Sequence, residues 1–282
     1  MTSAVIEVRN LRKVYESVVA VDDVTFSIDR GEIFALLGPN GAGKTTTVEI
    51  LEGYRSRSAG DVRVLGADPA QPSRRWLSRI GIVLQSSKIS DEITVSEVLE
   101  QTASYYAAPR RPDEVIAMVG LESKRDDRVS KLSGGQQRRL DVGLAIIGRP
   151  ELLFLDEPTT GFDPEARRQF WSLIENLREE GTSMLLTTHY LDEAEVLADR
   201  VGVIANGRMI AIGTPASLGG RDHAPTIVHW QGPDGPREQQ AANPTQLVIE
   251  LAEQFGGDVP GLAVVRPTLE DTYLKMIGEA RK

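Results

Sequence analysis

The sequence has no cysteine and few aromatic residues, which make up only 5% of its 282 residues. The lack of cysteine excludes a disulfide framework, a thiolate metal site and a cysteine nucleophile. Long apolar runs are also missing, because no segment approaches the roughly 18 to 20 apolar residues that a membrane-spanning helix needs. Near the start, Glu7 and Arg9 interrupt the apolar core that a signal peptide requires, so we expect no cleaved leader.

Positive charge is scarce as well. The 32 Lys and Arg residues are outnumbered by 41 Asp and Glu residues, which gives a formal net charge of -9. Proteins that bind nucleic acid usually carry a basic surface, so we expect no nucleic-acid partner. Hydrophobic residues at 40% and charged residues at 26% are typical of a globular chain with room for one large domain and a smaller one.

Short apolar runs bounded by turn residues alternate with helical patterns along the chain. This order predicts an α/β domain with a largely parallel core sheet. Polar residues follow each run, at the strand end where open α/β sheets bind ligands. The four clearest predicted strands are residues 33–37, 152–155, 184–188 and 201–204.

The composition changes near Gly220. Residues 223–245 are rich in Pro, Gly and Gln, which favours an edge strand and a loop, and helical patterns follow at 247–255 and 268–277. We therefore expect domains at 1–220 and 221–282. The apolar positions of the two helices have the spacing of packed faces, so we expect them to be buried against the first domain, a second copy or another protein. We therefore favour a small accessory domain that regulates the first domain or stabilises a dimer, and a solvated surface annex is the alternative. These positions are Leu247, Ile249, Leu251, Phe255, Leu269, Tyr273, Leu274 and Ile277.

The stretch GPNGAGKTTT (residues 38–47) fits the pattern G-x-x-x-x-G-K-[ST] through Gly38, Gly43, Lys44 and Thr45. Glycines allow backbone N–H groups to converge on phosphates, and the following helix adds the positive end of its dipole. Lys44 supplies a mobile cation, and the Thr45 hydroxyl can bind Mg²⁺. A solvated glycine turn is the alternative. Because strand, loop, Lys-Thr and helix coincide here, we expect a nucleotide site.

A second informative stretch is ELLFLDEPTTGFDP, where an apolar strand ends in Asp156 and Glu157. Beside a glycine loop, the first carboxylate can reach Mg²⁺ through water, and the second can polarise the attacking water. Taken alone, Asp-Glu-Pro is equally well explained as a cap of the following helix. The glycine loop in the same chain favours catalysis.

A third stretch, Leu132-Ser133-Gly134-Gly135-Gln136, offers a hydroxyl, exposed N–H groups and a helix dipole, which together make a second anion site. An ordinary Ser N-cap on a core helix is the alternative. The chain thus has two candidate phosphate-binding helix ends. Their spacing alone does not decide whether both act on one nucleotide.

Five elements in this order resemble the nucleotide-binding subunit of ATP-binding cassette (ABC) transporters: GPNGAGKTT, GIVLQ, LSGGQ, LLFLDEP and LLTTHYLDEAE. LSGGQ is that family's own signature, and the resemblance covers roughly residues 5–218. It implies an α/β fold, a P-loop NTPase cassette with a mainly parallel core sheet, an antiparallel β edge and a helical subdomain at about 91–145, followed by a small C-terminal α+β domain. Within the subdomain, EITVSEVLEQTASYYA, PDEVIAMVGLE and KRDDRVSKL predict short amphipathic helices.

In that family two cassettes pack head to tail, and each ATP lies between the glycine loop of one cassette and the LSGGQ of the other. The resemblance therefore implies bound ATP and Mg²⁺ and a second ABC subunit, for which we expect an identical copy. The implied ATP-binding residues are Tyr15, by stacking on adenine, Gly38, Asn40, Gly41, Gly43, Lys44, Thr45, Thr46, Ser133, Gly135, Gln136 and Asp163. The implied Mg²⁺ ligands are Thr45, Gln85 and Asp156, and the implied catalytic residues are Glu157, His189 and Gln85. Phe162 replaces the usual leucine but leaves Asp163 in place.

THYLDEAE and PTLEDTYLKMIG resemble the drug, lipid and polysaccharide exporter branch, which includes daunorubicin-resistance-type ATPases. This resemblance implies a separate transmembrane permease and a cytoplasmic position on the inner face of the membrane. An importer ATPase is the first alternative. A soluble non-transport ABC ATPase is disfavoured by the single cassette, and a module that binds ATP without turnover is disfavoured because Glu157 and His189 are both present.

Overall fold

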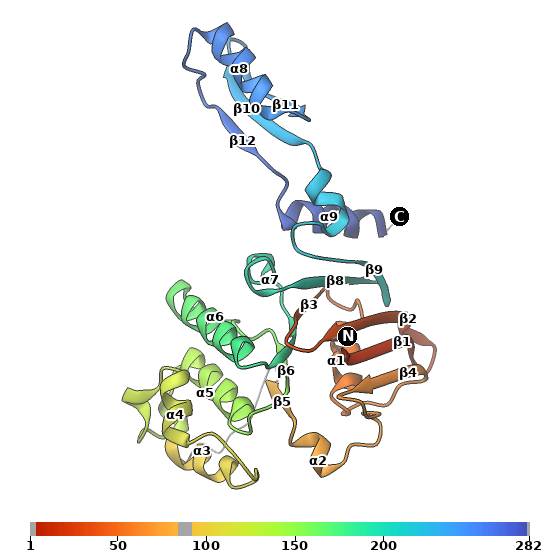
Figure 1. Cartoon of the computed structure of the whole chain (residues 1–282), viewed down its shortest axis with the longest axis vertical. Helices are drawn as coiled ribbons and strands as arrows, with labels where there is room; N and C mark the ends of the chain where they lie inside the picture. The colour runs from red at the N-terminus through yellow and green to blue at the C-terminus, as the bar shows by residue number, and fades with distance from the viewer. Residues whose placement is uncertain (1–3, 84–91, 281–282) are drawn as a thin grey trace. The chain divides into compact units, whose positions relative to one another are not determined.

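The computed structural model describes residues 4–83 and 92–280. The chain divides into two compact units, Met1–Ile212 and Gly213–Lys282. Figure 1 shows the elements of both units, and each unit is described here by itself. None of the helices in the described part of the chain combines the length and the apolar character that crossing a bilayer requires.

A six-stranded sheet in the order β5-β6-β7-β3-β8-β9 forms the centre of the first unit. Its strands are β3 (Ile33–Leu37), β5 (Ile80–Val83), β6 (Leu152–Asp156), β7 (Ser183–Thr187), β8 (Arg200–Ala205) and β9 (Arg208–Gly213). Neighbouring strands from β5 to β8 run parallel, which confirms the predicted sheet and its four clearest strands. Every residue of β3 and β7 is buried, because both faces of this sheet are covered.

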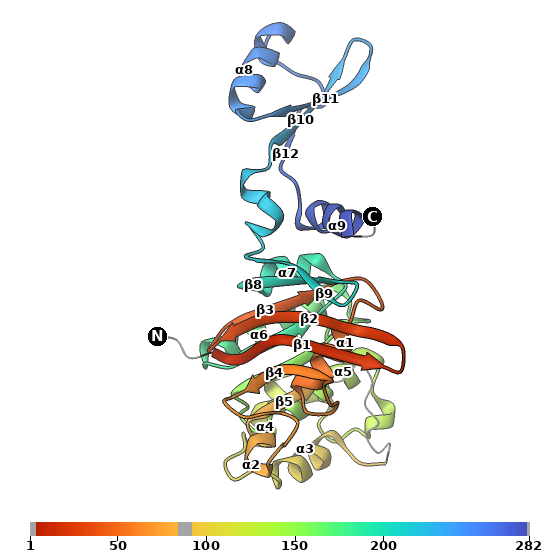
Figure 2. The same cartoon turned by 90° about the vertical axis from the view of Figure 1, so that its right-hand side faces the viewer.

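A three-stranded antiparallel sheet, β2-β1-β4, forms the predicted β edge of this unit (Figure 2). Its strands are β1 (Ala4–Tyr15), β2 (Val18–Asp29) and β4 (Ala59–Val64). One apolar cluster joins residues of these strands to β3 and to the helix α1 (Lys44–Leu51). Within it, the rings of Phe26 and Phe34 stack with centroids 5.3 Å apart. This packing holds the start of α1 at the carboxyl end of β3.

A second apolar cluster joins the helical subdomain to the other side of the central sheet. The remaining helical elements of the first unit are α2 (Arg74–Leu77), α3 (Val95–Ala103), α4 (Pro112–Met118), η1 (Glu122–Lys124), η2 (Val129–Lys131), α5 (Gly134–Ile146), α6 (Pro164–Glu179) and α7 (Leu191–Leu197). Thr94 and Glu97 cap α3 reciprocally, and Ser133 and Gln136 cap α5 in the same way. These two capping boxes fix where the subdomain helices begin.

The helix predicted for KRDDRVSKL is wrong, because this stretch contains only the last residue of η1 and the short 3₁₀ turn η2. The N–H of Val95 donates to the carbonyl of Asp127 at 3.1 Å, and the N–H of Ser96 donates to the carbonyl of Arg125 at 3.0 Å. The carbonyls that a helix would use internally therefore satisfy the first turn of α3 instead. Tertiary contact overrides the local helical pattern.

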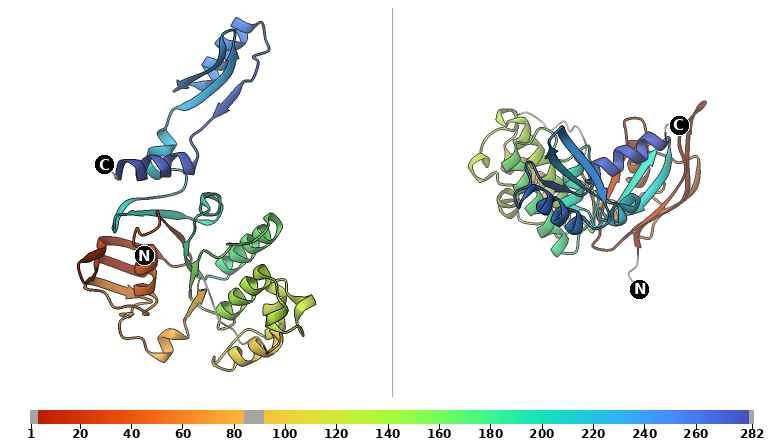
Figure 3. Two further views of the ribbon diagram at one scale, coloured as in Figure 1. Left: turned by 180° about the vertical axis from the view of Figure 1, so that it is seen from behind. Right: turned by 90° about the horizontal axis from the view of Figure 1, so that it is seen from above.

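The second unit is a small α+β arrangement (Figure 3). It consists of η3 (Leu218–His223), β10 (Thr226–Gly232), β11 (Gly235–Ala241), α8 (Pro244–Phe255), β12 (Ala263–Val265) and α9 (Leu269–Ala280). The antiparallel sheet has the order β11-β10-β12, so the segment predicted as an edge strand and a loop is in fact a hairpin. Its buried apolar cluster is small and centres on Val228, Leu251 and Val259.

Within the single chain, two of the apolar positions of the last two helices are exposed, so their predicted burial against a second copy or another protein stays a prediction. Ile249 is 49% exposed and Leu274 is 58% exposed, whereas Leu251 and Leu269 are buried. Helical spacing identifies the apolar residues, but α8 packs against β10 and α9 packs against η3, each with only part of its surface. The small core of this unit therefore depends on few side chains.

We predict that Leu251→Ala destabilises residues 213–282 by about 2–4 kcal/mol, because it opens a cavity in this small core. Ile249→Ala on the same helix is the matched control and should change the stability by less than about 0.5 kcal/mol, since its side chain is half exposed. Hydrogen exchange of the amides in β10 and α8 measures the effect. An equal loss of protection in the two variants would contradict the assignment of this core.

Candidate active site

The glycine loop, residues 38–46, leaves the carboxyl end of β3 and enters α1. A Cβ on Gly38 would overlap the carbonyl oxygen of Ile204 in β8, and a Cβ on Gly43 would lie 2.5 Å from the carbonyl oxygen of Ala20. Gly43 also has a φ of 103°, a left-handed conformation that side chains disfavour. These two positions therefore require glycine for the backbone to pack against β8 and β2.

Lys44 is buried at the start of α1, with 8% of its surface exposed. Its Nζ donates hydrogen bonds to the carbonyl oxygens of Gly38, at 2.6 Å, and Pro39, at 3.2 Å. Burial lowers the pKa of Lys44, while the nearby charges of Glu157 and Asp156 raise it. The loop thus holds a poorly solvated cation that phosphate oxygens would stabilise.

The other predicted residues of the glycine loop lie around this lysine. Asn40 and Gly41 are exposed at the tip of the loop, and Gly41 has a φ of 77°. Thr45 is exposed and Thr46 is half-buried in the first turn of α1. Tyr15, at the end of β1, is half-buried, and the cations of Lys13 and Arg55 lie 4.9 and 5.3 Å from its ring centroid. Gln85 lies outside the described residues.

Two carboxylates and a histidine meet where β6 and β7 end. The Thr187 hydroxyl donates to Oδ1 of Asp156, and these two residues are also register partners across the sheet. Nε2 of His189 contacts Oε1 of Glu157. Both strands run parallel, so their carboxyl ends bring Asp156, Glu157 and His189 to one edge of the sheet. The strand β3, which leads into the glycine loop, pairs in parallel with β7, so the loop also lies at this edge.

Glu157 has a left-handed backbone, with a φ of 47°. Such a conformation costs on the order of 1–3 kcal/mol for a residue other than glycine, and it persists only where the surroundings impose it. The N–H of Glu157 donates to the carbonyl of Thr187 at 2.9 Å. On either side of Glu157, the Arg138 guanidinium donates to the carbonyls of Asp156 and Pro158. These bonds hold the turn that carries the carboxylate.

The predicted second anion site forms the start of α5. Ser133 is the N-cap, its Oγ accepts from the N–H of Gln136 at 3.3 Å, and the Gln136 side chain accepts from the N–H of Ser133 at 2.9 Å. Asp163 caps α6 and accepts from the N–H of Ala166 at 2.8 Å. Among the described residues, no hydrogen bond or ion pair joins Ser133, Gln136 or Asp163 to the glycine loop. Within one chain these residues and the glycine loop are therefore separate groups.

The positions where Gly134 and Gly135 would carry a side chain are not occupied by other atoms of the chain. A Cβ on Gly134 would meet no atom within 4 Å, and one on Gly135 would only touch the Phe162 ring at 3.8 Å. Neither glycine has a positive φ. Unlike Gly38 and Gly43, these glycines are not required by the folded chain.

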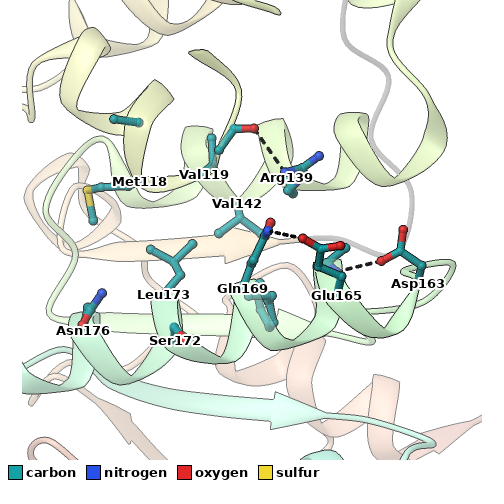
Figure 4. A pocket seen from close by; sticks show the side chains of 14 residues that line it. Met118, Val119, Arg139, Val142, Asp163, Glu165, Gln169, Ser172, Leu173 and Asn176 are labelled. Carbon is teal, nitrogen blue, oxygen red and sulfur yellow. Dashed lines mark hydrogen bonds between the residues drawn. The ribbon is translucent and has the colours of Figure 1, made fainter. Parts of the chain in front are cut away.

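A groove of about 740 Å³ lies beside the site, between α6 and the helices α4 and α5 (Figure 4). Asp163 lies at one end of the groove and Asn176 at the other. In between, the Gln169 amide donates to Glu165 at 3.4 Å, and Arg139 donates to the carbonyl of Gly120 at 3.1 Å. The groove adjoins the start of α6, and none of its lining residues belongs to the glycine loop.

Comparison with known proteins identifies the family. A family model described as "ABC transporter" matches residues 21–160. The Nod factor export ATP-binding protein I of Ralstonia nicotianae is 36% identical, over 98% of this chain and 95% of the relative. The chain belongs to the ABC transporter ATPases. The linearmycin resistance ATP-binding protein LnrL of Bacillus subtilis is 37% identical, over 79% of this chain and 73% of that protein.

Solved ABC cassettes share the fold. One described as the ATP binding subunit of an ABC transporter has a TM-score of 0.73 at 25% identity and covers 96% of this chain and 99% of its own. A dimeric cassette in a post-hydrolysis state with ADP and Pi has a TM-score of 0.67 at 22% identity, over 74% of this chain and 98% of its own. This ABC ATPase is therefore an ATP-binding and ATP-hydrolysing subunit. Cassettes of the family dimerise and work with membrane permease components.

Three charged residues of the site were missed by sequence reasoning. Arg138 is 7% exposed, and its burial lowers its pKa. Glu193 is fully buried, and this burial raises its pKa. Glu52, 7% exposed at the end of α1, has its pKa raised to about 8 by burial and then by the charges of Asp156 and Glu49. In the sequence, each looks like an ordinary charge on a helix, so no local pattern distinguishes them.

We predict that Glu52→Gln stabilises the nucleotide-free protein at alkaline pH. The folded-state pKa of about 8 lies above the ordinary 4.5, so folding favours the protonated carboxyl. The unmutated protein should therefore lose stability as the pH rises from about 4.5 to about 8, by on the order of a few kcal/mol. Gln removes this loss. Thermal unfolding across this pH range measures the pH dependence of stability. Glu100→Gln, at an exposed position, is the control. The prediction is refuted if the stability of Glu52→Gln falls with pH in the same way as that of the unmutated chain.

Proposed function

We propose that this ABC ATPase hydrolyses MgATP between two copies of itself and thereby powers export through a separate permease. The contact between His189 and the Glu157 carboxylate, beside the buried cation of Lys44, carries the catalytic part of this proposal. A module that binds ATP without hydrolysing it does not need a glutamate and a histidine in contact at this position. The export part is supported by relatives named for Nod factor export and linearmycin resistance, and not by the site.

The glycine loop would bind the phosphates of ATP. Lys44 would exchange its bonds to the loop carbonyls for bonds to phosphate oxygens, and the backbone N–H groups near Gly41 and Gly43 would add further donors. Tyr15 would stack on the adenine, with Lys13 and Arg55 beside the same ring.

The residues present fit a Mg²⁺ ion that is bound mainly through the nucleotide. Among the described residues there is no cluster of three or more His, Cys, Asp or Glu side chains that could hold a metal alone. Mg²⁺ usually keeps several waters and binds one or two protein oxygens together with phosphate oxygens. Here the Thr45 hydroxyl and the Asp156 carboxylate would supply the protein oxygens, and Gln85 remains a proposed third ligand. When bound, the ion would neutralise charge on the phosphates.

In hydrolysis, the Glu157 carboxylate would orient a water and accept its proton as the water attacks the γ-phosphate. His189 would hold Glu157 and donate toward the γ-phosphate oxygens, with Gln85 assisting at the same water. The bond between the γ-phosphorus and the bridging oxygen breaks, and the leaving group is ADP. The strained turn at Glu157 is consistent with this role, because backbone strain is concentrated at functional sites.

A second copy would complete each site. Ser133, Gly135 and Gln136 of one copy would bind the γ-phosphate held by the glycine loop of the other, and Asp163 would lie at the same interface. The unfilled space at Gly134 and Gly135 supports this, because nothing within the chain requires glycine there. A helix N-terminus with exposed N–H groups is suited to a phosphate.

The membrane partner would be a polytopic permease, with the ATPase on the cytoplasmic face of the membrane. We favour export over import on the names of the relatives. Expression of the chain with a candidate permease, followed by ATP-dependent uptake of candidate substrates into inside-out vesicles, tests the direction. Accumulation only in right-side-out vesicles would indicate an importer.

We predict that Glu157→Gln lowers ATP turnover by roughly 10²- to 10⁴-fold while ATP still binds, because an amide cannot accept the proton. The ATP-bound dimer should accumulate. Steady-state phosphate release, a direct ATP titration and the oligomeric state with MgATP measure the three effects. Turnover within a few-fold of the unmutated protein would show that Glu157 is not the catalytic carboxylate.

We predict that Gly135→Ala leaves the folded chain intact or stabilises it by roughly 0.5–1 kcal/mol, since alanine favours helix and has room here. ATP affinity of the monomer should stay unchanged, while the ATP-driven dimer and turnover should be lost. Gly278→Ala is the matched control, because it also adds a methyl group to a helix in open space. If Gly135→Ala dimerises and turns over like the control, the composite site is wrong.

A further inference from the structure

Arg138 lies on the first turns of α5, shortly after the residues proposed to bind the nucleotide of a second copy. Its side chain points into the molecule and is 7% exposed. Nε donates to the carbonyl of Pro158 at 3.2 Å, and Nη2 donates to the carbonyl of Asp156. These two carbonyls belong to the residues immediately before and after Glu157. One guanidinium therefore spans the turn that carries the catalytic carboxylate.

The charge environment supports a geometric role for this bridge. Asp141, Asp156, Glu157 and Glu193 all favour the cationic form of Arg138, which opposes the effect of burial. A guanidinium stays charged in proteins and offers five N–H donors in a fixed plane. Two donors of one rigid plane can thus fix two carbonyls relative to each other. A lysine has a single mobile point charge and cannot reproduce that fork.

The backbone at Glu157 needs such support. Its φ of 47° is disfavoured for glutamate, and the turn continues through a weak bond from the N–H of Thr160 to the carbonyl of Glu157 at 3.3 Å. The Thr187 carbonyl holds the N–H of Glu157, whereas Arg138 holds the carbonyls of both neighbours. Without Arg138, the peptide groups on both sides of Glu157 would lose these buried donors and the turn could relax.

We propose that Arg138 is a positioning residue for ATP hydrolysis, which keeps the Glu157 carboxylate in contact with His189 by clamping the Asp156 and Pro158 carbonyls. The inference rests on the catalytic role proposed for Glu157. Both of these bonds of Arg138 go to the turn that carries Glu157, so the residue acts on the hydrolysis step and not on ATP binding. A misplacement of about 1 Å can cost a reaction about 10²-fold in rate.

The test is Arg138→Met, which removes the donors and keeps most of the volume. The expected result is a fall in kcat of about 10²-fold, with KM and directly measured ATP affinity within about threefold of the unmutated values. The MgATP-bound dimer should still form. Arg139→Met is the matched control on the same helix, since Arg139 donates to the carbonyl of Gly120 and lines the groove beside α6 (Figure 4). It should retain kcat.

Arg138→Lys and Arg138→Gln keep the test decisive if the Met variant does not fold. Each of these side chains retains a hydrogen-bond donor but lacks the two parallel N–H groups of a guanidinium. We therefore expect kcat to fall by about tenfold or more while the ATP affinity stays unchanged. In the Glu157→Gln background, Arg138→Met should cause little further loss in single-turnover rate, because the two residues act as one unit. Two results would overturn the inference. One is a folded Arg138 variant with unchanged kcat. The other is an Arg138→Met change that lowers the single-turnover rate of Glu157→Gln as much as it lowers that of the unmutated protein. If Glu157→Gln itself retains turnover, the proposed function fails instead.

Discussion

The pairing of β7 with both β3 and β6 is the constraint on which the site depends. Thr187 aligns with Leu36 on one side and with Asp156 on the other. Its hydroxyl donates to the Asp156 carboxylate, and its carbonyl accepts from the N–H of Glu157. A shift of one residue in the register of either strand pair would move each side chain of the shifted strand to the opposite face of the sheet. The glycine loop after β3 and the carboxylates after β6 lie at one edge of the sheet because β7 pairs in register with both strands.

The glycine loop and the ends of the strands were predictable because local backbone requirements leave a trace in the sequence. Gly38 and Gly43 are glycines since a Cβ at either position would collide with a neighbouring carbonyl. The strand before Asp156 is a continuous apolar run since it is buried on both faces. The Ser133 cap was predictable for the same reason, because its partner Gln136 is only three residues away. Residues whose partners lie within a few positions, or within their own strand, can be found from the sequence.

The rest of the site depends on partners that are distant in the sequence. Arg138 bonds to the turn around Glu157 across roughly 20 positions, and the raised pKa of Glu52 reflects burial and a carboxylate more than 100 positions away. The same reason explains the wrong helix in KRDDRVSKL, whose carbonyls bind the start of α3. Burial of a charged side chain is a property of the packed molecule, so buried residues such as Arg138 and Glu52 resemble surface charges until the fold is known.

The two units differ in how their stability is supported. The first unit has extensive apolar clusters on both sides of the central sheet, whereas the cluster around β10 has three buried residues and several half-buried ones. A small apolar core gives a segment of about 70 residues limited stability, although Leu218, Leu269 and Ile277 are also buried in this unit. Its exposed apolar side chains include Ile249, Val264 and Leu274, which additional burial would stabilise. The described catalytic candidates all lie in the first unit, so we expect sequence change in the second unit to alter its stability and contacts more than the ATP chemistry.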